Sequence, residues 1–189
     1  QIFDADGSRL GGFQLPGQVV PRVRHRNIVL SGIGTLQFTG RSIVMSQPDL
    51  DGLVTIFTLN GHPFRTFGIL RPTGHEGNRQ VHLALNSGIP LVNADGSFYF
   101  VFQAGVPVFR KYDARGTLIF ERHIEGVDLD PIIGALPTNW TDGRTPGDLP
   151  AVPPTVRAAA VDRSDHLWVA LAVPVLYVYD STGEKIRTV

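Results

Sequence analysis

One five-residue pattern, an aromatic residue followed four positions later by glycine, constrains this chain more than any other feature of its sequence. It occurs at residues 3–7, 57–61, 112–116 and 179–183. In every copy the aromatic residue ends an apolar run, and the glycine stands where a tight hairpin turn requires a positive φ. The four glycines lie 54, 55 and 67 residues apart, which leaves room for four short strands and a connector. The chain is therefore expected to repeat a four-stranded β unit.

Residues 156–189 show the complete unit as four short apolar runs separated by turn residues. The runs read VRAAAVD, HLWVALA, VLYVYD and EKIRTV. Because the same order of runs recurs earlier, we expect an incomplete unit, two complete units, an inserted loop and the last unit. Their expected boundaries are 1–15, 16–68, 69–124, 125–155 and 156–189. The inserted loop is rich in proline and glycine, which predicts no regular element within it.

Alternating apolar residues bounded by glycine and aspartate clusters locate the strands of the two middle units. The expected strands are 36–39, 41–46, 53–59 and 63–67 in the second unit, and 89–93, 97–103, 106–112 and 117–124 in the third. Residues 18–34 are expected to form a connector whose second half begins the second unit. No segment shows a convincing helical period, so the fold class is predicted to be all-β with little or no helix.

The motifs at the turns are most complete in the last unit, with Asp162 before the first turn and Trp168 in the strand after it. The third unit matches through Asn93 to Gly96 and through Tyr112-Asp113, whereas the second departs, with Thr58 in place of aspartate. These units resemble the blades of NHL-type and related six-bladed β-propellers. The resemblance implies a β-propeller of four-stranded antiparallel blades, about three and a half of which are present. Members of this superfamily include binding scaffolds, lactonase-like hydrolases and lyases, so the resemblance implies an architecture and no single activity.

An incomplete ring of blades leaves apolar blade faces uncovered, which soluble monomers rarely show. We therefore expect this chain to be a piece of a longer six- or seven-bladed protein, or to meet a second copy or another chain that supplies the missing strands. The chain begins with glutamine inside an expected strand, which suggests that its natural beginning has been removed.

Composition excludes several classes of partner. The formal net charge is zero and the sequence pI is about 7.2, so no overall field favours nucleic acid. The most apolar segment, 168–179, contains a proline and is too short to span a membrane. Cysteine is absent, which removes thiol catalysis and cysteine-based zinc sites and suits a bacterial extracytoplasmic protein, either periplasmic or secreted.

Connectors between units are expected to emerge on one face around the central channel, where propellers usually bind their ligands. In an extended chain Arg22, Arg24 and Arg26 point the same way and would gather a small anionic ligand. The alternative is a solvated connector whose charges are balanced by neighbouring carboxylates. Arg79 follows in the next connector, beside His75 and Glu76, and is a further candidate for ligand binding.

Two further candidate sites lie in the connectors. His75, Glu76 and His82 are candidate ligands for a divalent metal, although their spacing fits no helix-borne zinc motif. The alternative is that these side chains form hydrogen bonds at the surface. Trp140 in the inserted loop would stack on a sugar or an aromatic ligand, or would tie the loop to the body of the protein as an apolar plug.

No serine elbow, glycine-rich phosphate loop or nucleophile–base spacing is recognisable in the sequence. The first functional hypothesis is therefore a non-catalytic binding or assembly module without a cofactor, which uses the loop face for a protein or small-ligand partner. The alternative is a hydrolase or lyase of the lactonase-like propeller type, with a histidine and aspartate site, assisted by a metal, at the channel face.

Overall fold

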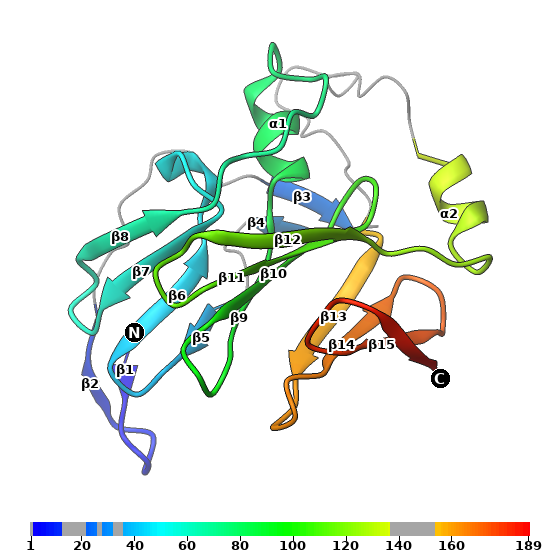
Figure 1. Cartoon of the computed structure of the whole chain (residues 1–189). Helices are drawn as coiled ribbons and strands as arrows, with labels where there is room; N and C mark the ends of the chain where they lie inside the picture. The colour runs from blue at the N-terminus through cyan, green and yellow to red at the C-terminus, as the bar shows by residue number, and fades with distance from the viewer. Residues whose placement is uncertain (1, 13–21, 26–27, 32–35, 137–153) are drawn as a thin grey trace.

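The computed structural model describes residues 2–12, 22–25, 28–31, 36–136 and 154–189. Most of their regular structure consists of β-strands in antiparallel sheets (Figure 1). Three sheets have four strands each, in chain order. Sheet I contains β5 (Leu36–Phe38), β6 (Ser42–Ser46), β7 (Val54–Thr58) and β8 (Pro63–Phe67). Sheet II contains β9 (Gly88–Val92), β10 (Phe98–Phe102), β11 (Val108–Tyr112) and β12 (Leu118–His123). Sheet III contains β13 (Val156–Val161), β14 (Leu167–Leu171), β15 (Leu176–Tyr179) and β16 (Lys185–Thr188).

These three sheets confirm the predicted four-stranded antiparallel units, because their strands coincide within a few residues with the ranges expected from the sequence. The incomplete first unit is present as the hairpin β1 (Ile2–Phe3) and β2 (Arg9–Gly11). One expectation is corrected. Instead of forming a connector that runs into sheet I, the chain forms a separate hairpin of β3 (Arg22–His25) and β4 (Ile28–Ser31), because these strands pair with each other.

Helix is scarce, as predicted, but two short helices stand where none was expected. Helix α1 (Arg79–Leu85) lies in the connector between sheets I and II, and α2 (Asp130–Gly134) lies in the inserted loop. The expectation that proline and glycine exclude a regular element from that loop is therefore wrong. Pro131 occupies the first turn of α2, where a helix needs no backbone donor. Among the described residues the one further helical segment is the 3-10 turn η1 (Pro48–Leu50), and no helix there is long and apolar enough to cross a membrane.

The repeated aromatic-to-glycine pattern forms the same hairpin turn in all four copies. Gly7, Gly61, Gly116 and Gly183 have φ values between +81° and +86°, and each donates its N–H to the carbonyl three residues earlier. In three copies an aspartate carboxylate accepts backbone N–H groups two and four residues later. Thr58 replaces this aspartate in sheet I, and its hydroxyl accepts one such bond, from His62. The same turn therefore forms with threonine in place of aspartate.

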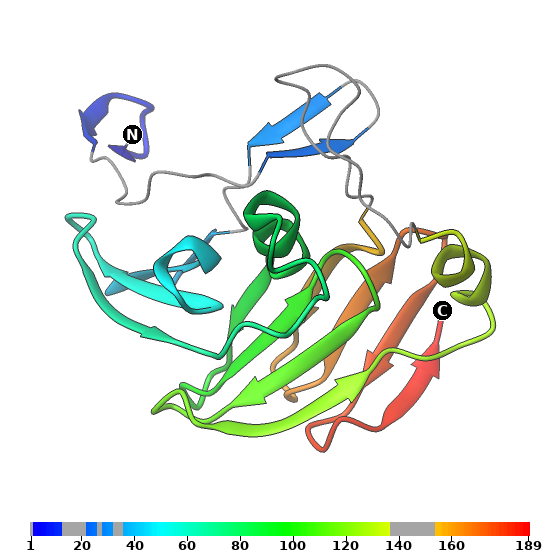
Figure 2. The same cartoon turned by 90° about the horizontal axis from the view of Figure 1, so that it is seen from above.

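The three sheets lie one after another in chain order and pack face to face (Figure 2). We call the face of a sheet that is turned toward the sheet following it in the chain its front, and the opposite face its back. The cluster between sheets I and II joins the front residues Val44, Val54 and Ile56 to the back residues Phe98, Phe100 and Tyr112. The cluster between sheets II and III joins the front residues Ile89, Val101 and Phe109 to the back residues Val169, Tyr177 and Tyr179. At the inner edge, β9 lies against β5 of sheet I and β13 of sheet III.

A polar contact fixes sheet III against sheet II beside their apolar cluster. The Lys111 ammonium, on the front of sheet II, donates to Asp165 at 2.6 Å and to the carbonyl of Ser181 at 3.1 Å. Asn93 donates to the other carboxylate oxygen of Asp165 at 2.8 Å. Both contacts to Asp165 reach a turn of sheet III, so they set how the two sheets align as well as how closely they approach.

Replacing Gly116 with alanine is expected to destabilise the protein. The residue has a φ of +82°, where an L-residue costs about 1–2 kcal/mol, and an added Cβ would lie 2.7 Å from Cγ of Phe67. The free energy of unfolding, measured in urea, should fall by at least that amount. Gly77→Ala is the matched control, because Gly77 has no positive φ and no atom within 4 Å of an added Cβ. Equal stability of the two variants would contradict the turn geometry.

Candidate functional site

The connectors between successive sheets emerge at one end of the stack, where α1 and α2 both lie (Figure 1). We call this end, with residues 69–86 and 124–136, the loop end. The turns of the aromatic-to-glycine pattern lie at the other ends of the same strands. The expectation that the connectors share one face is thereby met for the two connectors that join sheets I, II and III.

The three predicted metal ligands all form hydrogen bonds with Thr73 in the loop that precedes α1. Glu76 accepts the backbone N–H groups of Thr73 at 2.7 Å and Gly74 at 3.2 Å, and the Thr73 bond above all lowers the pKa of Glu76. Nδ1 of His82 lies 2.8 Å from the Thr73 hydroxyl and 3.8 Å from the Glu76 carboxylate. Glu76 and His82 are therefore close together, and the backbone N–H of His75 binds the Thr73 hydroxyl. Across the described residues, no three His, Cys, Asp or Glu side chains are grouped so that they would hold a metal ion.

Arg71 ties this loop to the body of sheet II. Its guanidinium donates to the carbonyls of Leu85 at 3.0 Å, Ala104 at 2.6 Å and Val106 at 2.8 Å. It also lies 4.2 Å from the centre of the Phe102 ring, and its burial, followed by the nearby charge of Arg110, lowers the pKa of Arg71 to about 10. These contacts join the start of the connector, the end of α1 and the β10–β11 turn.

The structure brings together two of the predicted arginine-bearing elements. Arg79 is the exposed first residue of α1, and β3, which contains Arg22 and Arg24, lies against α1. Arg22 and Arg24 are two positions apart on that strand, which pairs with β4. Arg26 and Trp140, the other two candidates for ligand binding, lie outside the described residues.

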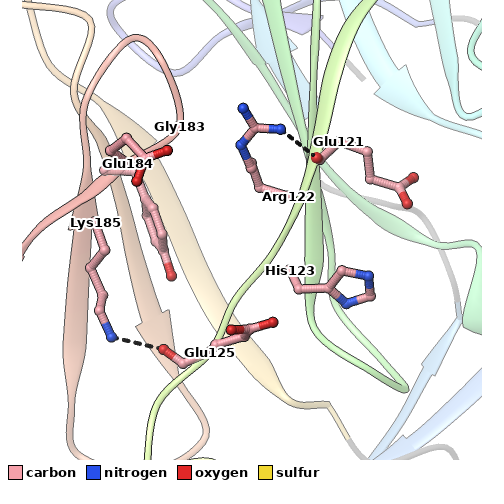
Figure 3. Close-up of a pocket in the computed structure, with 8 residues that line it drawn as sticks. Glu121, Arg122, His123, Glu125, Gly183, Glu184 and Lys185 are labelled. Atoms are coloured by element: carbon pink, nitrogen blue, oxygen red, sulfur yellow. Dashed lines mark hydrogen bonds between the residues drawn. The ribbon is translucent and has the colours of Figure 1, made fainter.

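A pocket of about 430 Å³ lies between the outer strands β12 and β16 and was not predicted from the sequence (Figure 3). Its lining is mostly charged and consists of Glu121, Arg122, His123, Glu125, Tyr179, Gly183, Glu184 and Lys185. Figure 3 shows Arg122 on the side of the β15–β16 turn, while Glu121 and His123 point away from it. Because the two strands come from different sheets, no local spacing in the sequence could have indicated this pocket.

Structural contacts engage most of the charges around this pocket. Glu121 binds Nε of Arg110 at 2.5 Å, and Lys185 donates to the carbonyl of Glu125 at 2.8 Å. The Lys185 ammonium also lies 4.3 Å from the centre of the Tyr177 ring. Burial raises the pKa of the Tyr179 phenol, so this group stays neutral. The pocket therefore offers polar binding groups but no activated nucleophile.

A second unpredicted cluster surrounds Asp162 in the first turn of sheet III. One carboxylate oxygen accepts the backbone N–H groups of Ser164 and His166. The other accepts the indole N–H of Trp168 at 3.0 Å and lies 3.1 Å from Nδ1 of His166. The indole bond above all lowers the pKa of Asp162 to about 2. In the described part of the chain the His166 ring binds no hydroxyl group, so this pair lacks a nucleophile to activate.

Trp168 differs in burial from the other large aromatic residues of sheets II and III. The following aromatic residues of these two sheets are buried: Phe98, Tyr99, Phe100, Phe102, Tyr177 and Tyr179. Trp168 is only half-buried, and its register with Ala160 and Val178 puts it on the front of sheet III. The sequence signal that separates it from the others is Asp162, six positions earlier and able to hold the indole N–H at the surface.

Comparison with known proteins gives no relative from which a function could be transferred. No protein-family model matches the chain, and none of the curated proteins matches it. Its function is therefore inferred from its own geometry.

Replacing Trp168 with phenylalanine is expected to raise the pKa of Asp162 from about 2 toward its ordinary value of 3.8, because the strongest donor to the carboxylate is lost. Since the folded-state pKa is the lower one, the carboxylate's contribution to stability is complete above pH 3.8 and disappears as the pH falls through about 2. Carboxyl ¹³C NMR titration measures the change, with Asp113 as an internal reference that should not move. An unchanged Asp162 pKa in the variant would show that the indole does not control it.

Proposed function

We propose that this chain is part of a β-propeller and acts as a non-catalytic binding module. Support for the propeller comes from the way the sheets stack. Each is an up-and-down sheet of four strands, the sheets pack front to back in chain order, and β5, β9 and β13 adjoin at the inner edge. Blades arranged around an axis have these three properties together.

The proposed ligand is a small anion or an acidic group of a partner, bound at the loop end. The observation that carries this proposal is the contact between β3, which contains Arg22 and Arg24, and α1, which begins with Arg79. Guanidinium groups bind carboxylate and phosphate through paired hydrogen bonds, and three arginines on two elements that lie against each other favour a multiply charged ligand. The loop before α1 is already held by Glu76 and Arg71, so binding would cost little ordering entropy.

Catalysis by histidine and aspartate, as in lactonase-like propellers, is less well supported by the same geometry. Glu76 and His82 are engaged in holding the loop, and the pair of Asp162 and His166 lies in a turn at the other end of the sheets. General base catalysis of hydrolysis needs a base directed at a hydroxyl group or a water beside the substrate. Binding of an anion requires only positively charged side chains, which the arginines at the loop end supply.

The triple variant Arg22→Gln, Arg24→Gln, Arg79→Gln is expected to weaken binding of tripolyphosphate at least tenfold, because each lost charge-assisted hydrogen bond is worth about 1.5–3 kcal/mol. Isothermal titration calorimetry at fixed ionic strength measures the affinity. The matched control is Arg9→Gln, Arg115→Gln, Arg163→Gln, which removes three exposed arginines away from the loop end, one from strand β2 and two from hairpin turns. Wild-type protein that does not bind tripolyphosphate, or an equal loss in both triple variants, would contradict the proposal.

A further inference from the structure

The pocket between β12 and β16 plays no part in the proposed function. Its volume of about 430 Å³ lies within the range of small-ligand sites, roughly 300–1,000 Å³. Its walls belong to two complete four-stranded sheets, and the ammonium of Lys185 joins them by donating to the carbonyl of Glu125 at 2.8 Å. Glu121, which also lines the pocket, is already paired with Arg110. Arg79 of the proposed anion site does not line it, so the two sites are distinct.

Each wall of the pocket carries one positive and one negative side chain. Arg122 and Glu125 come from β12 and the residues that follow it, and Glu184 and Lys185 come from the start of β16 (Figure 3). All four residues are exposed, so a ligand in the pocket can reach them. Because their charges cancel, the electrostatically complementary ligand has charges of both signs and no net charge.

The structural contacts of these side chains leave bonding capacity for a ligand. Within the described residues, the carboxylates of Glu125 and Glu184 accept no hydrogen bond and form no ion pair. Arg122 donates one N–H to the carbonyl of Glu121 at 3.2 Å, and Lys185 donates one to the carbonyl of Glu125. A guanidinium has five N–H donors and an ammonium has three, so both cations keep donors for a ligand.

The wall of the pocket also contains a polar group that lacks a partner. Tyr179 lines the pocket and is only 3% exposed, and its hydroxyl is buried with no hydrogen-bond partner among the described residues. Burial raises the pKa of this phenol, so it remains a neutral group that can both donate and accept. Buried polar groups nearly always have a partner in native proteins, and a molecule in the pocket would supply one here.

A ligand that binds by stacking is not favoured at this pocket, because its lining residues cover the adjoining aromatic rings. The Arg122 guanidinium lies 4.9 Å from the centre of the Phe120 ring, and the Lys185 ammonium lies 4.3 Å from the centre of the Tyr177 ring. Stacking of a sugar or an aromatic ligand needs an open aromatic face. The charged groups are therefore what the pocket offers for recognition.

From this paired arrangement of charges we infer that the pocket binds a small zwitterion, either a free amino acid or a short peptide with free ends. Its carboxylate would bind the donors of Arg122 and Lys185, and its ammonium would bind the carboxylates of Glu125 and Glu184. A simple anion would meet two carboxylates without a counter-ion, and a simple cation would meet two positive groups. The inference adds a second ligand to the proposed binding module and does not depend on the anion site.

Titration with glycylglycine, followed by ¹⁵N NMR at the amides of Gly183 and Glu184, tests this inference. Acetyl-glycylglycine lacks the ammonium and glycylglycine amide lacks the carboxylate. Each should bind at least about fivefold more weakly than glycylglycine, because each loses its ion pairs with one pair of side chains. Glycine, titrated in the same way, shows whether the pocket prefers a free amino acid or a peptide.

Two variants assign the ends of the ligand to the charges of the pocket. Arg122→Gln should weaken binding of glycylglycine at least about threefold and leave binding of glycylglycine amide unchanged. Glu184→Gln should weaken glycylglycine to a similar extent and leave acetyl-glycylglycine unchanged. Arg187→Gln and Asp6→Asn, at exposed residues outside the pocket, are the matched controls. All four variants should melt at the wild-type temperature, because the residues changed are exposed.

Three results would overturn the inference. Glycylglycine and glycine that leave the amides of the pocket unshifted would show that no zwitterion binds there. Equal affinity for acetyl-glycylglycine and glycylglycine would show that the pocket selects an anion alone, and binding of methyl glucoside in place of both would indicate a sugar site. Tripolyphosphate binding by Arg122→Gln, expected to equal that of the wild-type protein, separates a failure of this pocket from a failure of the anion site.

Discussion

The packing of one sheet's front on the next sheet's back is the interaction on which the rest of this structure depends. A four-stranded sheet with apolar residues on both faces cannot remain alone in water, because each buried Å² of apolar surface contributes roughly 25 cal/mol. Sheet II meets this requirement on both sides: Phe100 and Tyr112 are buried against sheet I, and Tyr99 and Phe109 belong to the cluster with sheet III. The loop end and the pocket between β12 and β16 are consequences of how these sheets are aligned.

Turn chemistry makes this packing possible by fixing which residues reach which face. A slip of one residue in a strand pair would turn every side chain to the opposite face. The glycines with positive φ prevent such a slip, since each fixes the number of residues in its hairpin turn and therefore the register of the two strands. The aspartates that precede them accept backbone N–H groups of the turn, and Asp165, which has a φ of +62°, joins its turn to Lys111 of the neighbouring sheet. Asp165 therefore contributes both to the geometry of its turn and to the alignment of sheet III with sheet II.

The strands of the three complete units could be predicted from the sequence because their signals are local. Alternating apolar residues and a glycine at a fixed place in each turn are properties of adjacent positions, as in the run Phe98–Phe102. Helix α1 could not be predicted, because seven residues are too few to show a helical period. It begins after Asn78, whose side chain accepts the N–H of Val81. The hairpin of β3 and β4 also escaped prediction, since Arg22 to His25 read equally well as a connector.

The candidate sites were predictable only where one segment contains them. Glu76 and His82 could be grouped as candidate metal ligands because they lie in one short segment of the sequence. That Thr73 would bind both of them could not be predicted. The pocket between β12 and β16 is lined by Arg122 and Lys185, which are far apart in the sequence. The residues on the front of sheet III can be identified only when the strand pairing is known. Such sites depend on long-range alignment of sheets, which no local pattern in the sequence records.

Front-to-back stacking in chain order is tested most directly by nuclear Overhauser contacts between aromatic rings of neighbouring sheets. In protein labelled at phenylalanine and tyrosine, the ring of Tyr179 should show contacts to Phe109, and the ring of Tyr112 should show contacts to Phe67. These pairs join sheet III to sheet II and sheet II to sheet I through the turn aromatic on the back of each sheet. Absence of both contacts, with Tyr112 and Tyr179 instead contacting residues of their own sheets alone, would contradict the stacking.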